Sequence, residues 1–210
     1  MTTPFVVVGC GGFGREVAML VEAINSASPT YELLGFVDDA PTPSNLQALR
    51  DMDAALLGDS SWLDSAPAGC EAVIGIGSAA VRRRLDQRWP SLRWATLIHP
   101  DATVGRDVRL GPGTVVAPGA RLSTAIRVGR HVHIDQNATI GHDSYLGDYV
   151  RLNPQACVSG AVTVEPEAMV GANATILQGL RVGASAVVGA GAVVVRDVVA
   201  QAVVKGVPAR

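Results

Sequence analysis

Aliphatic residues recur at every sixth position through the second half of the chain. From Ile98 to Val194, each step of six residues reaches Val, Ile or Leu. A glycine often follows the aliphatic residue, and a small or β-branched residue comes four positions after it, as in Ile140, Gly141 and Ser144. A fixed period over so long a stretch indicates a solenoid, because each unit buries its aliphatic side only against its neighbours.

The length of the unit predicts the kind of solenoid. Six residues hold one short strand and a corner, so three units make a triangular coil of 18 residues in which each aliphatic side chain stacks on its copy one coil later. We expect the residue beside it, usually glycine but Asp135 or Asn153 in two coils, to adopt the positive φ of a tight corner. An ordinary β-sandwich alternates with period two and has irregular turns, so the pattern favours a parallel β-helix.

The first 95 residues follow a different pattern, in which short apolar runs alternate with helical periodicity. The runs are Phe5–Val8, Leu33–Val37, Ala54–Leu57 and Ala72–Ile76. One helix is predicted through Val17 to Ile24 and another from Ala79 to Arg88, while Pro41, Pro43 and Ser44 predict a loop. Alternating strands and helices indicate a small parallel α/β sheet, half of a dinucleotide-binding fold. We therefore expect two domains, residues 1–95 and residues 96–210, the second ending in a C-terminal tail.

Three features gather at one edge of the predicted sheet. A glycine-rich turn, Gly9 to Gly14, leads from the first strand into a helix, where backbone N–H groups can approach an anion. Asp38 and Asp39 follow the second strand, and Gly77 follows the fourth. Because ligands bind at the carboxyl edge of such sheets, a nucleotide is the expected ligand. One such unit is too little for NAD, and a purely structural tight turn remains the alternative.

Composition and charge narrow the classes of partner and location that the sequence allows. The chain of 210 residues is 48% hydrophobic, has a net charge of −2 and has no long charged run, so neither nucleic acid nor an anionic membrane is expected as a partner. Arg82, Arg83 and Arg84 are interpreted as the solvated face of a helix. The three cysteines have no metal-binding spacing, and no signal peptide or apolar span of about 20 residues is found. We expect a reducing, cytoplasmic environment.

The clearest candidate for catalysis lies on one column of the predicted β-helix. The 18-residue coil stacks Thr124, His142, Gly160 and Gln178, so the residue above His142 has no side chain. Asp143 follows His142 and can hold one tautomer of the imidazole. A surface histidine that only caps a corner is the alternative. The other histidines, such as His131 and His133, complete no zinc ligand set, so no metal is expected.

Five segments of the sequence are similar to those of a known family. They are Val7–Glu16, Val37–Asp39, Ile74–Gly77, Ile140–Asp143 and Gly206–Arg210. The chain resembles, end to end, the sugar N-acyltransferases of the hexapeptide-repeat superfamily, which acylate amino groups on UDP-, dTDP- or GDP-linked sugars. The resemblance implies a left-handed parallel β-helix, acetyl-CoA as co-substrate, a nucleotide-linked amino sugar as acceptor, and a homotrimer with the acyl-CoA cleft between adjacent prisms.

The resemblance also implies roles for particular residues. His142 would be the general base, and Asp143 would raise its basicity. The residues expected to contact the nucleotide sugar are Gly11, Gly12, Phe13, Asp38, Asp39 and Gly77. The residues expected to line the acetyl-CoA arm are Arg151, Gly160, Ala172 and Ala190. Two positions depart from the family, because Phe13 stands where relatives often have histidine and Arg151 where some have histidine.

Two other functions remain open from the sequence. An O-acetyltransferase, or an acyl-CoA transferase acting on a small hydroxyl acceptor, would use the same histidine. A non-catalytic β-helix binding module is the third reading, although an intact His142–Asp143 pair argues against it. For assembly, we expect the outward side chains of Val132, Tyr145 and Tyr149 to pack against a neighbouring prism.

Overall fold

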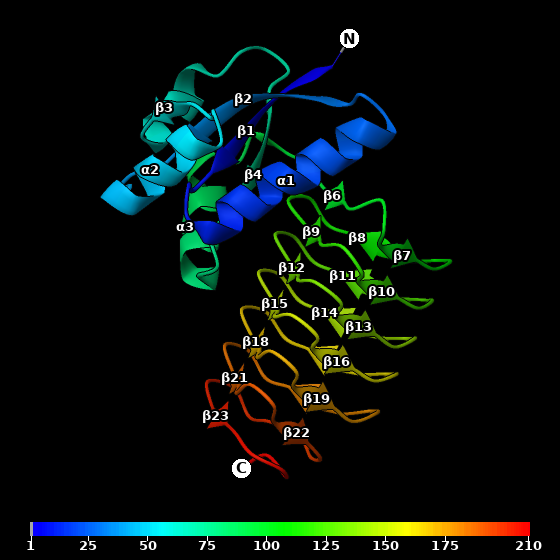
Figure 1. The fold of residues 1–210 in the computed structure, drawn as a ribbon. Coiled ribbons are helices and arrows are strands. Elements are labelled where there is room, and N and C mark those ends of the chain that lie inside the picture. The colour runs from blue at the N-terminus through cyan, green and yellow to red at the C-terminus, as the bar shows by residue number, and fades with distance from the viewer. Residues whose placement is uncertain (1) are drawn as a thin grey trace. The chain divides into compact units, whose positions relative to one another are not determined.

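The computed structural model describes residues 2–210, which divide after Pro100 into two compact units (Figure 1). The first unit is an α/β domain and the second is a coil of very short parallel strands. Both fold types that the sequence predicts, the small parallel sheet and the left-handed parallel β-helix, are confirmed.

The first unit is built on a five-stranded parallel sheet in the order β3-β2-β1-β4-β5. Its strands are β1 (Thr3–Val8), β2 (Tyr31–Val37), β3 (Leu56–Gly58), β4 (Glu71–Ile74) and β5 (Arg93–Trp94), and β6 (Leu97–Ile98) comes just before Pro100. Its helices are α1 (Gly12–Ala27), α2 (Pro43–Asp51) and α3 (Ala79–Arg88), with a 3₁₀ helix at Ser60–Ser65. The central strand β1 is buried from Phe5 to Val8, as expected of a strand with neighbours on both sides.

The loop predicted at Pro41, Pro43 and Ser44 is confirmed only for Pro41, because α2 begins at Pro43. Thr42 caps this helix, because its Oγ1 accepts a hydrogen bond from the Asn45 N–H at 3.2 Å. Pro43 occupies the first helical turn, where the N–H that proline lacks would have no helical partner. The prediction was wrong for Pro43 and Ser44 because it took proline as a loop signal and did not consider a capped helix start.

The prediction that Arg82, Arg83 and Arg84 form a solvated face is wrong for the first of them. Arg82 is fully buried, whereas Arg83 and Arg84 are exposed. The Arg82 guanidinium donates from Nη1 to the carbonyls of Ile76, at 3.1 Å, and Gly77, at 2.7 Å. The buried arginine therefore ties α3 to the loop that leaves β4.

The second unit has three parallel sheets, one for each side of a triangular prism (Figure 1). The first contains β7 (Thr103–Val104), β10 (Arg121–Leu122), β13 (Thr139–Ile140), β16 (Cys157–Val158), β19 (Thr175–Ile176) and β22 (Val193–Val194). The second contains β8 (Arg109–Leu110), β11 (Arg127–Val128), β14 (Tyr145–Leu146), β17 (Thr163–Val164) and β20 (Arg181–Val182). The third continues through β9 (Val115–Val116), β12 (His133–Ile134), β15 (Arg151–Leu152), β18 (Met169–Val170), β21 (Val187–Val188) and β23 (Val203–Val204).

From β7 to β22, strands pair with the strand 18 residues later, which is the register that the six-residue repeat predicts. Ile140 pairs with Leu122 on one side and with Val158 on the other. The last pair departs from it, because Val187 of β21 pairs with Val203 of β23, 16 residues later. The second residue of each strand points inward, and this stack forms the prism core together with the small or β-branched residue two positions before it, such as Ala138 or Ala156.

The prediction that the residue directly after the aliphatic one adopts positive φ is wrong. Positive φ occurs two residues further on, for example at His131 (52°), Asp143 (60°) and Tyr149 (61°). The glycine next to the aliphatic residue is required for another reason. A Cβ on Gly147 would lie 2.5 Å from the Pro166 nitrogen, and one on Gly171 would lie 2.5 Å from the Ala190 nitrogen. These glycines let successive coils approach closely.

Two of the three side chains predicted to face outward point elsewhere. Val132 is fully buried in the prism core, because it occupies the small or β-branched position of its unit. Tyr149 is buried and stacks on His131 with ring centroids 5.8 Å apart. Only Tyr145 is exposed as predicted, with 44% of its surface accessible.

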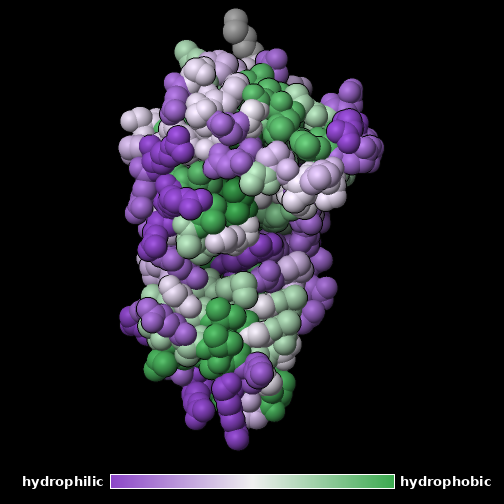
Figure 2. Space-filling model, turned by 90° about the vertical axis from the view of Figure 1, so that its left-hand side faces the viewer, coloured by the Kyte–Doolittle hydropathy of each residue, from purple (hydrophilic) through white to green (hydrophobic). Residues whose placement is uncertain are grey.

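Part of the exposed apolar surface of the prism lies along its third sheet. Met169, Val187 and Val203 are the outward residues of β18, β21 and β23, and they pair directly along the sheet. Met169 is 37% exposed and Val203 is 69% exposed. Figure 2, which views the molecule from the side of these strands, shows apolar side chains gathered over the lower coils. We call Met169, Val187 and Val203 the apolar column.

Candidate functional site

His142 and Asp143 lie together on the corner that follows β13. The Nδ1 atom of His142 is 2.7 Å from Oδ2 of Asp143, and both side chains are more than half exposed. Asp143 adopts a φ of 60°, which directs its carboxylate back beside the preceding ring. A hydrogen bond from Nδ1–H to the carboxylate leaves the Nε2 lone pair free to accept a proton. The corner therefore presents an oriented base to solvent.

The backbone under this pair is anchored inside the prism. The His142 carbonyl accepts a hydrogen bond from the Ala161 N–H at 2.7 Å, and the Asp143 N–H donates to the Thr124 carbonyl at 3.1 Å. The buried hydroxyl of Ser144 donates to the Ser159 carbonyl and accepts from the Val162 N–H. These bonds tie the corner to the coils on both sides of it, so the imidazole stands on a fixed base.

Gly160 occupies the position of His142 one coil later and leaves the ring open. A Cβ at this position would lie 2.7 Å from Nε2 of His142, which is closer than any side chain can come. Within residues 2–210, the Gly160 N–H donates no hydrogen bond, while its carbonyl accepts one from Gly179. The corner thus combines an accessible base with a backbone donor, the pair of groups that acyl transfer requires.

The other residues expected to line acetyl-CoA lie elsewhere on the prism. Ala172 and Ala190 stack on the corner between the third sheet and the first, since the Gly191 N–H donates to the Ala172 carbonyl at 2.8 Å. Gly160 lies on the corner between the first sheet and the second. The structure therefore does not bring Gly160 together with Ala172 and Ala190 on one corner of a single chain.

Arg151 has a partner within the prism. Its Nε and Nη2 atoms both contact Oδ2 of Asp135, at 3.0 and 2.8 Å, and the Asp135 side chain is almost fully buried. Both residues belong to the third sheet and the corner that follows it. A contact between Arg151 and coenzyme phosphates stays a prediction, and it would have to form beside this ion pair.

The glycine-rich turn of the first unit contains two kinds of glycine. Gly9 has a φ of 100°, and a Cβ on Gly14 would collide with the Gly9 carbonyl, so both are needed for folding. A Cβ on Gly11 or Gly12 would meet nothing within 4 Å. The space over Gly11 and Gly12 at the start of α1 is therefore open to a ligand, and Phe13 follows on the first turn, half-buried.

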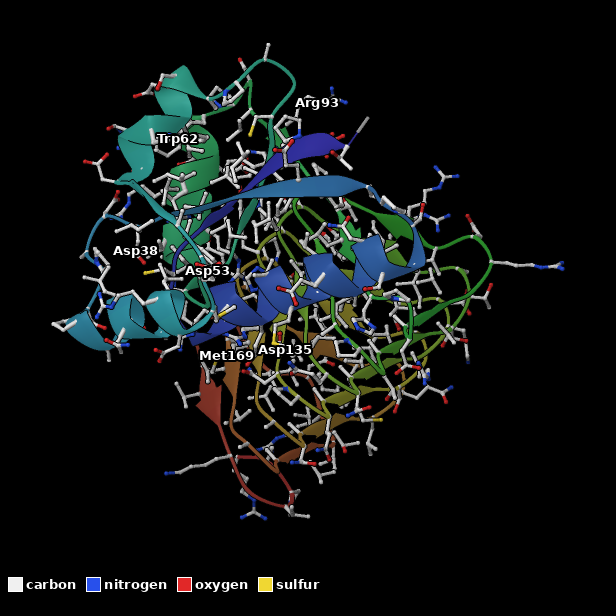
Figure 3. The ribbon with its side chains drawn as sticks, turned by 45° about the horizontal axis from the view of Figure 1, so that its top comes forward. Asp38, Asp53, Trp62, Arg93, Asp135 and Met169 are labelled. Carbon is white, nitrogen blue, oxygen red and sulfur yellow. The ribbon has the colours of Figure 1, made fainter. Side chains whose placement is uncertain are left out.

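Asp38 lies at the carboxyl edge of the sheet, at the opposite end from Arg93 (Figure 3). Its Oδ2 accepts a hydrogen bond from the Cys10 N–H at 2.8 Å, and its Oδ1 accepts one from the Ala40 N–H at 2.9 Å. Burial works to raise the pKa of Asp38, but these N–H donors outweigh it and hold the pKa below its usual value. Asp38 is therefore a charged group that fixes the glycine-rich turn.

Cys10, the second residue of this turn, is not a nucleophile. Burial, together with the adjacent Asp38 carboxylate, raises the pKa of the Cys10 thiol to about 12. The thiol is therefore neutral at physiological pH. Its backbone nevertheless organises the edge, because the Cys10 carbonyl accepts a hydrogen bond from Arg15 and its N–H binds Asp38.

A cavity of about 140 Å³ opens beside Asp38 and Asp39 at the same edge. Of the six residues expected to contact the nucleotide sugar, these two line it, whereas Gly11, Gly12, Phe13 and Gly77 do not. Further lining residues that the sequence interpretation missed are Ser60, Val81, Arg84 and Leu85. The helical spacing of Val81, Arg84 and Leu85 was the signal that could have placed them on one face of α3.

Residues 2–210 contain no group of three or more His, Cys, Asp or Glu side chains placed to hold a metal ion. Over the same residues, every helix is too short or too polar to cross a bilayer.

Comparison with known proteins identifies a matching family and a similar enzyme. Residues 5–88 match the family described as the PglD N-terminal domain. The chain is 29% identical, over 159 residues, to the GDP-perosamine N-acetyltransferase of Escherichia coli O157:H7. This alignment covers 74% of the chain and 70% of that enzyme.

Solved structures extend the similarity to the whole chain. One is a histidine-to-asparagine variant of perosamine N-acetyltransferase from Caulobacter crescentus, in complex with CoA and GDP-perosamine, with a TM-score of 0.86 and 28% identity. The match covers 99% of this chain and 95% of that one. Another is the acetyltransferase domain of PglB from Neisseria gonorrhoeae FA1090 with acetyl coenzyme A, with a TM-score of 0.87, 27% identity, and coverage of 100% and 99%.

Proposed function

We propose that this chain, a member of the hexapeptide-repeat sugar N-acetyltransferases, transfers the acetyl group of acetyl-CoA to the amino group of a nucleotide-linked sugar. The observation that carries the proposal is the exposed imidazole of His142, oriented by Asp143 and left uncovered by Gly160. Homologous enzymes with CoA and GDP-perosamine bound support both substrates. We also propose a reducing cytoplasmic location, which suits three cysteines that form no disulfide.

The residues on the corner fit direct acyl transfer. The sugar amine attacks the thioester carbonyl carbon, so a C–N bond forms while the C–S bond breaks and the CoA thiolate leaves. Nε2 of His142 accepts the proton that the amine loses, and the Asp143 carboxylate stabilises the resulting imidazolium through Nδ1–H. The Gly160 N–H is available to the oxyanion, a kind of donor worth about 3–4 kcal/mol in the transition state.

The acceptor's nucleotide fits the carboxyl edge of the first unit. The diphosphate is assigned to the N-terminus of α1, where Gly11 and Gly12 leave open space and no acidic residue occupies the first turn. The nucleoside is assigned to the cavity lined by Asp38 and Asp39. Phe13 and Gly77 keep their proposed contacts with the substrate, although neither lines this cavity.

A homotrimer is the assembly that we propose. Gly160 lies on one corner of the prism, whereas Ala172 and Ala190 lie on another. A coenzyme arm that touches Gly160 as well as Ala172 and Ala190 can lie between two neighbouring chains. The corner with Gly160 then belongs to one chain, and the corner with Ala172 and Ala190 belongs to the other. The exposed apolar column offers a surface for such packing.

The first test replaces the base. His142→Asn should lower kcat by roughly 100- to 10,000-fold, the range that a general base contributes, while the affinity for CoA stays unchanged. Release of CoA thiol with a nucleotide-linked 4-amino sugar measures kcat, and calorimetry measures CoA binding. The control is Gln178→Ala, which truncates an exposed side chain that stacks one coil after Gly160, in the column that contains His142. Undiminished turnover in His142→Asn would remove His142 from the mechanism.

The same assay separates amine from hydroxyl acceptors. A nucleotide sugar that carries a hydroxyl in place of the amine should give no thiol release above the background hydrolysis of acetyl-CoA. Faster transfer to the hydroxyl compound would reject N-acetylation in favour of O-acetylation.

A further inference from the structure

The cavity at the carboxyl edge of the first unit carries polar groups of both signs, and we propose that it selects guanine as the nucleobase of the substrate. This inference rests on the proposed function, because it specifies the base of the same nucleotide-linked sugar. The polar residues that line the cavity beyond Asp38 are Asp39, Ser60 and Arg84.

The walls of the cavity suit a planar ring better than a sugar. Val37, Ile76, Val81 and Leu85 line it, so most of its wall is aliphatic. A hexose placed there would bury hydroxyl groups against these side chains, which costs free energy unless each hydroxyl finds a partner. The base is therefore the part of the substrate that enters the cavity, while the diphosphate lies toward the glycine-rich turn.

The helix that carries Arg84 is held firmly in place. Val81, Arg84 and Leu85 have the i, i+3, i+4 spacing that places them on one face of α3. Buried Arg82 ties the helix to the carbonyls of Ile76 and Gly77, and Ser78 caps its first turn. The Arg84 side chain is exposed and forms no hydrogen bond or ion pair with any of residues 2–210, so its guanidinium donors are available to a ligand.

Asp39 supplies hydrogen-bond acceptors, in contrast to the donors of Arg84. Its Oδ1 accepts a hydrogen bond from the Ser60 N–H at 2.8 Å, which holds the carboxylate at the cavity and leaves Oδ2 for a ligand. A carboxylate accepts through about four lone-pair positions, so Oδ1 also keeps acceptor capacity. This side of the cavity therefore suits a group with adjacent hydrogen-bond donors, such as the N–H groups of a base.

Guanine is the base whose edges match this pair of residues. Its N1–H and N2–H groups are adjacent donors for the Asp39 carboxylate, and its O6 and N7 atoms are acceptors for the forked guanidinium of Arg84. Uracil and thymine present a single N–H, so the carboxylate would be only half used. Adenine presents an amino group but has no O6 acceptor for the arginine.

Binding of free nucleotides tests the base without knowledge of the sugar. Calorimetry on the full chain should show GDP binding roughly 10- to 100-fold more tightly than UDP and dTDP, the range expected for bidentate recognition of a base. Equal or tighter binding of UDP or dTDP overturns the proposal, and so does a failure of GDP to bind. Acetyl transfer to a UDP- or dTDP-linked amino sugar would leave the proposed function standing while the guanine assignment falls.

Matched variants test the two residues. Asp39→Asn and Arg84→Gln should each reduce GDP binding by roughly tenfold and lose most of the preference over UDP. Asp53→Asn and Arg88→Gln remove the same charges from exposed positions that do not line this cavity, and both should keep the preference. Thermal unfolding of all four proteins checks that they fold. A folded Asp39→Asn or Arg84→Gln protein with full GDP preference overturns the role of that residue.

Discussion

At the scale of single residues, the chemistry of the site depends both on the groups that contact a side chain and on the space left open beside it. The imidazole of His142 receives its direction from Asp143 and its access from Gly160. In the first unit, Asp38 is charged because two backbone N–H groups point at it. Each of these side chains can be altered by an isosteric substitution, which makes them suitable for testing.

Asp143→Asn isolates the charge of the residue beside the base. Asparagine tolerates the positive φ of this corner, and its amide oxygen can still accept the Nδ1–H hydrogen bond. Only the negative charge that stabilises the imidazolium is lost, so kcat should fall roughly 5- to 10-fold, much less than in His142→Asn. Steady-state kinetics on both variants checks this order. A loss in Asp143→Asn equal to that in His142→Asn would contradict the charge-only role.

The stability lost in Asp38→Asn should depend on pH. Because the folded-state pKa of Asp38 lies below its unfolded value, its contribution is fully present above the unfolded pKa, near 3.8, and is lost as pH falls through the folded pKa. At pH 7 the variant should be about 2 kcal/mol less stable, since an amide cannot accept both N–H bonds. The difference should shrink below pH 4. Urea unfolding at pH 7 and pH 3 measures it, with Asp53→Asn as the exposed control; an equal difference at both pH values would contradict the charge argument.

At the scale of elements, the repeat contains two different structural requirements. The residue directly after each aliphatic position lies against the next coil, whereas the residue two positions later adopts the left-handed conformation. In this chain the left-handed positions are held by Asp, Asn, Gln, His, Tyr, Ala and other residues as well as by Gly. Coil spacing, and not turn conformation, therefore explains the glycines beside the aliphatic residues.

Gly171→Ala and Gly191→Asn separate these two requirements. The alanine Cβ at position 171 would lie 2.5 Å from the Ala190 nitrogen, so the coils must shift and stability should fall by about 1–3 kcal/mol. Position 191 has a φ of 67° and open space around it, and asparagine tolerates this conformation, so Gly191→Asn should change stability by less than about 1 kcal/mol. Thermal unfolding compares them. A larger loss in Gly191→Asn would show that conformation, not spacing, limits the corner.

The sequence predicts the features of the fold and the site that depend on neighbouring residues, but not those that depend on contacts between distant segments. The repeat predicted the β-helix and its 18-residue register, because inward stacking is a property of every unit. The His142–Asp143 contact was also anticipated, since the two residues are adjacent in the chain. The partners of Arg82 and Arg151, and the cavity that includes Ser60, depend on tertiary contacts between distant segments that no local pattern records.

At the scale of the whole molecule, the question is whether one chain is a complete enzyme. The resemblance to hexapeptide-repeat sugar N-acetyltransferases is confirmed by the comparisons, and the left-handed prism with it. The predicted coenzyme contacts, however, are distributed over two corners of the prism. If the coenzyme arm touches both corners, as we propose, a single chain leaves His142 beside half of the binding site, and assembly becomes part of the catalytic argument.

The apolar column provides the test of that argument. Val203→Glu and Met169→Glu place a charge on the exposed column, so either should shift the protein from trimer to monomer if the column is buried between chains. Sedimentation analysis measures the mass, and thiol release on the same samples measures activity, which should fall with the trimer because Gly160 and Ala172 then no longer share a groove. Arg109→Glu, which inverts an exposed charge on the second sheet, should keep both the trimer and the activity. A monomer with full kcat would show that each prism holds acetyl-CoA alone.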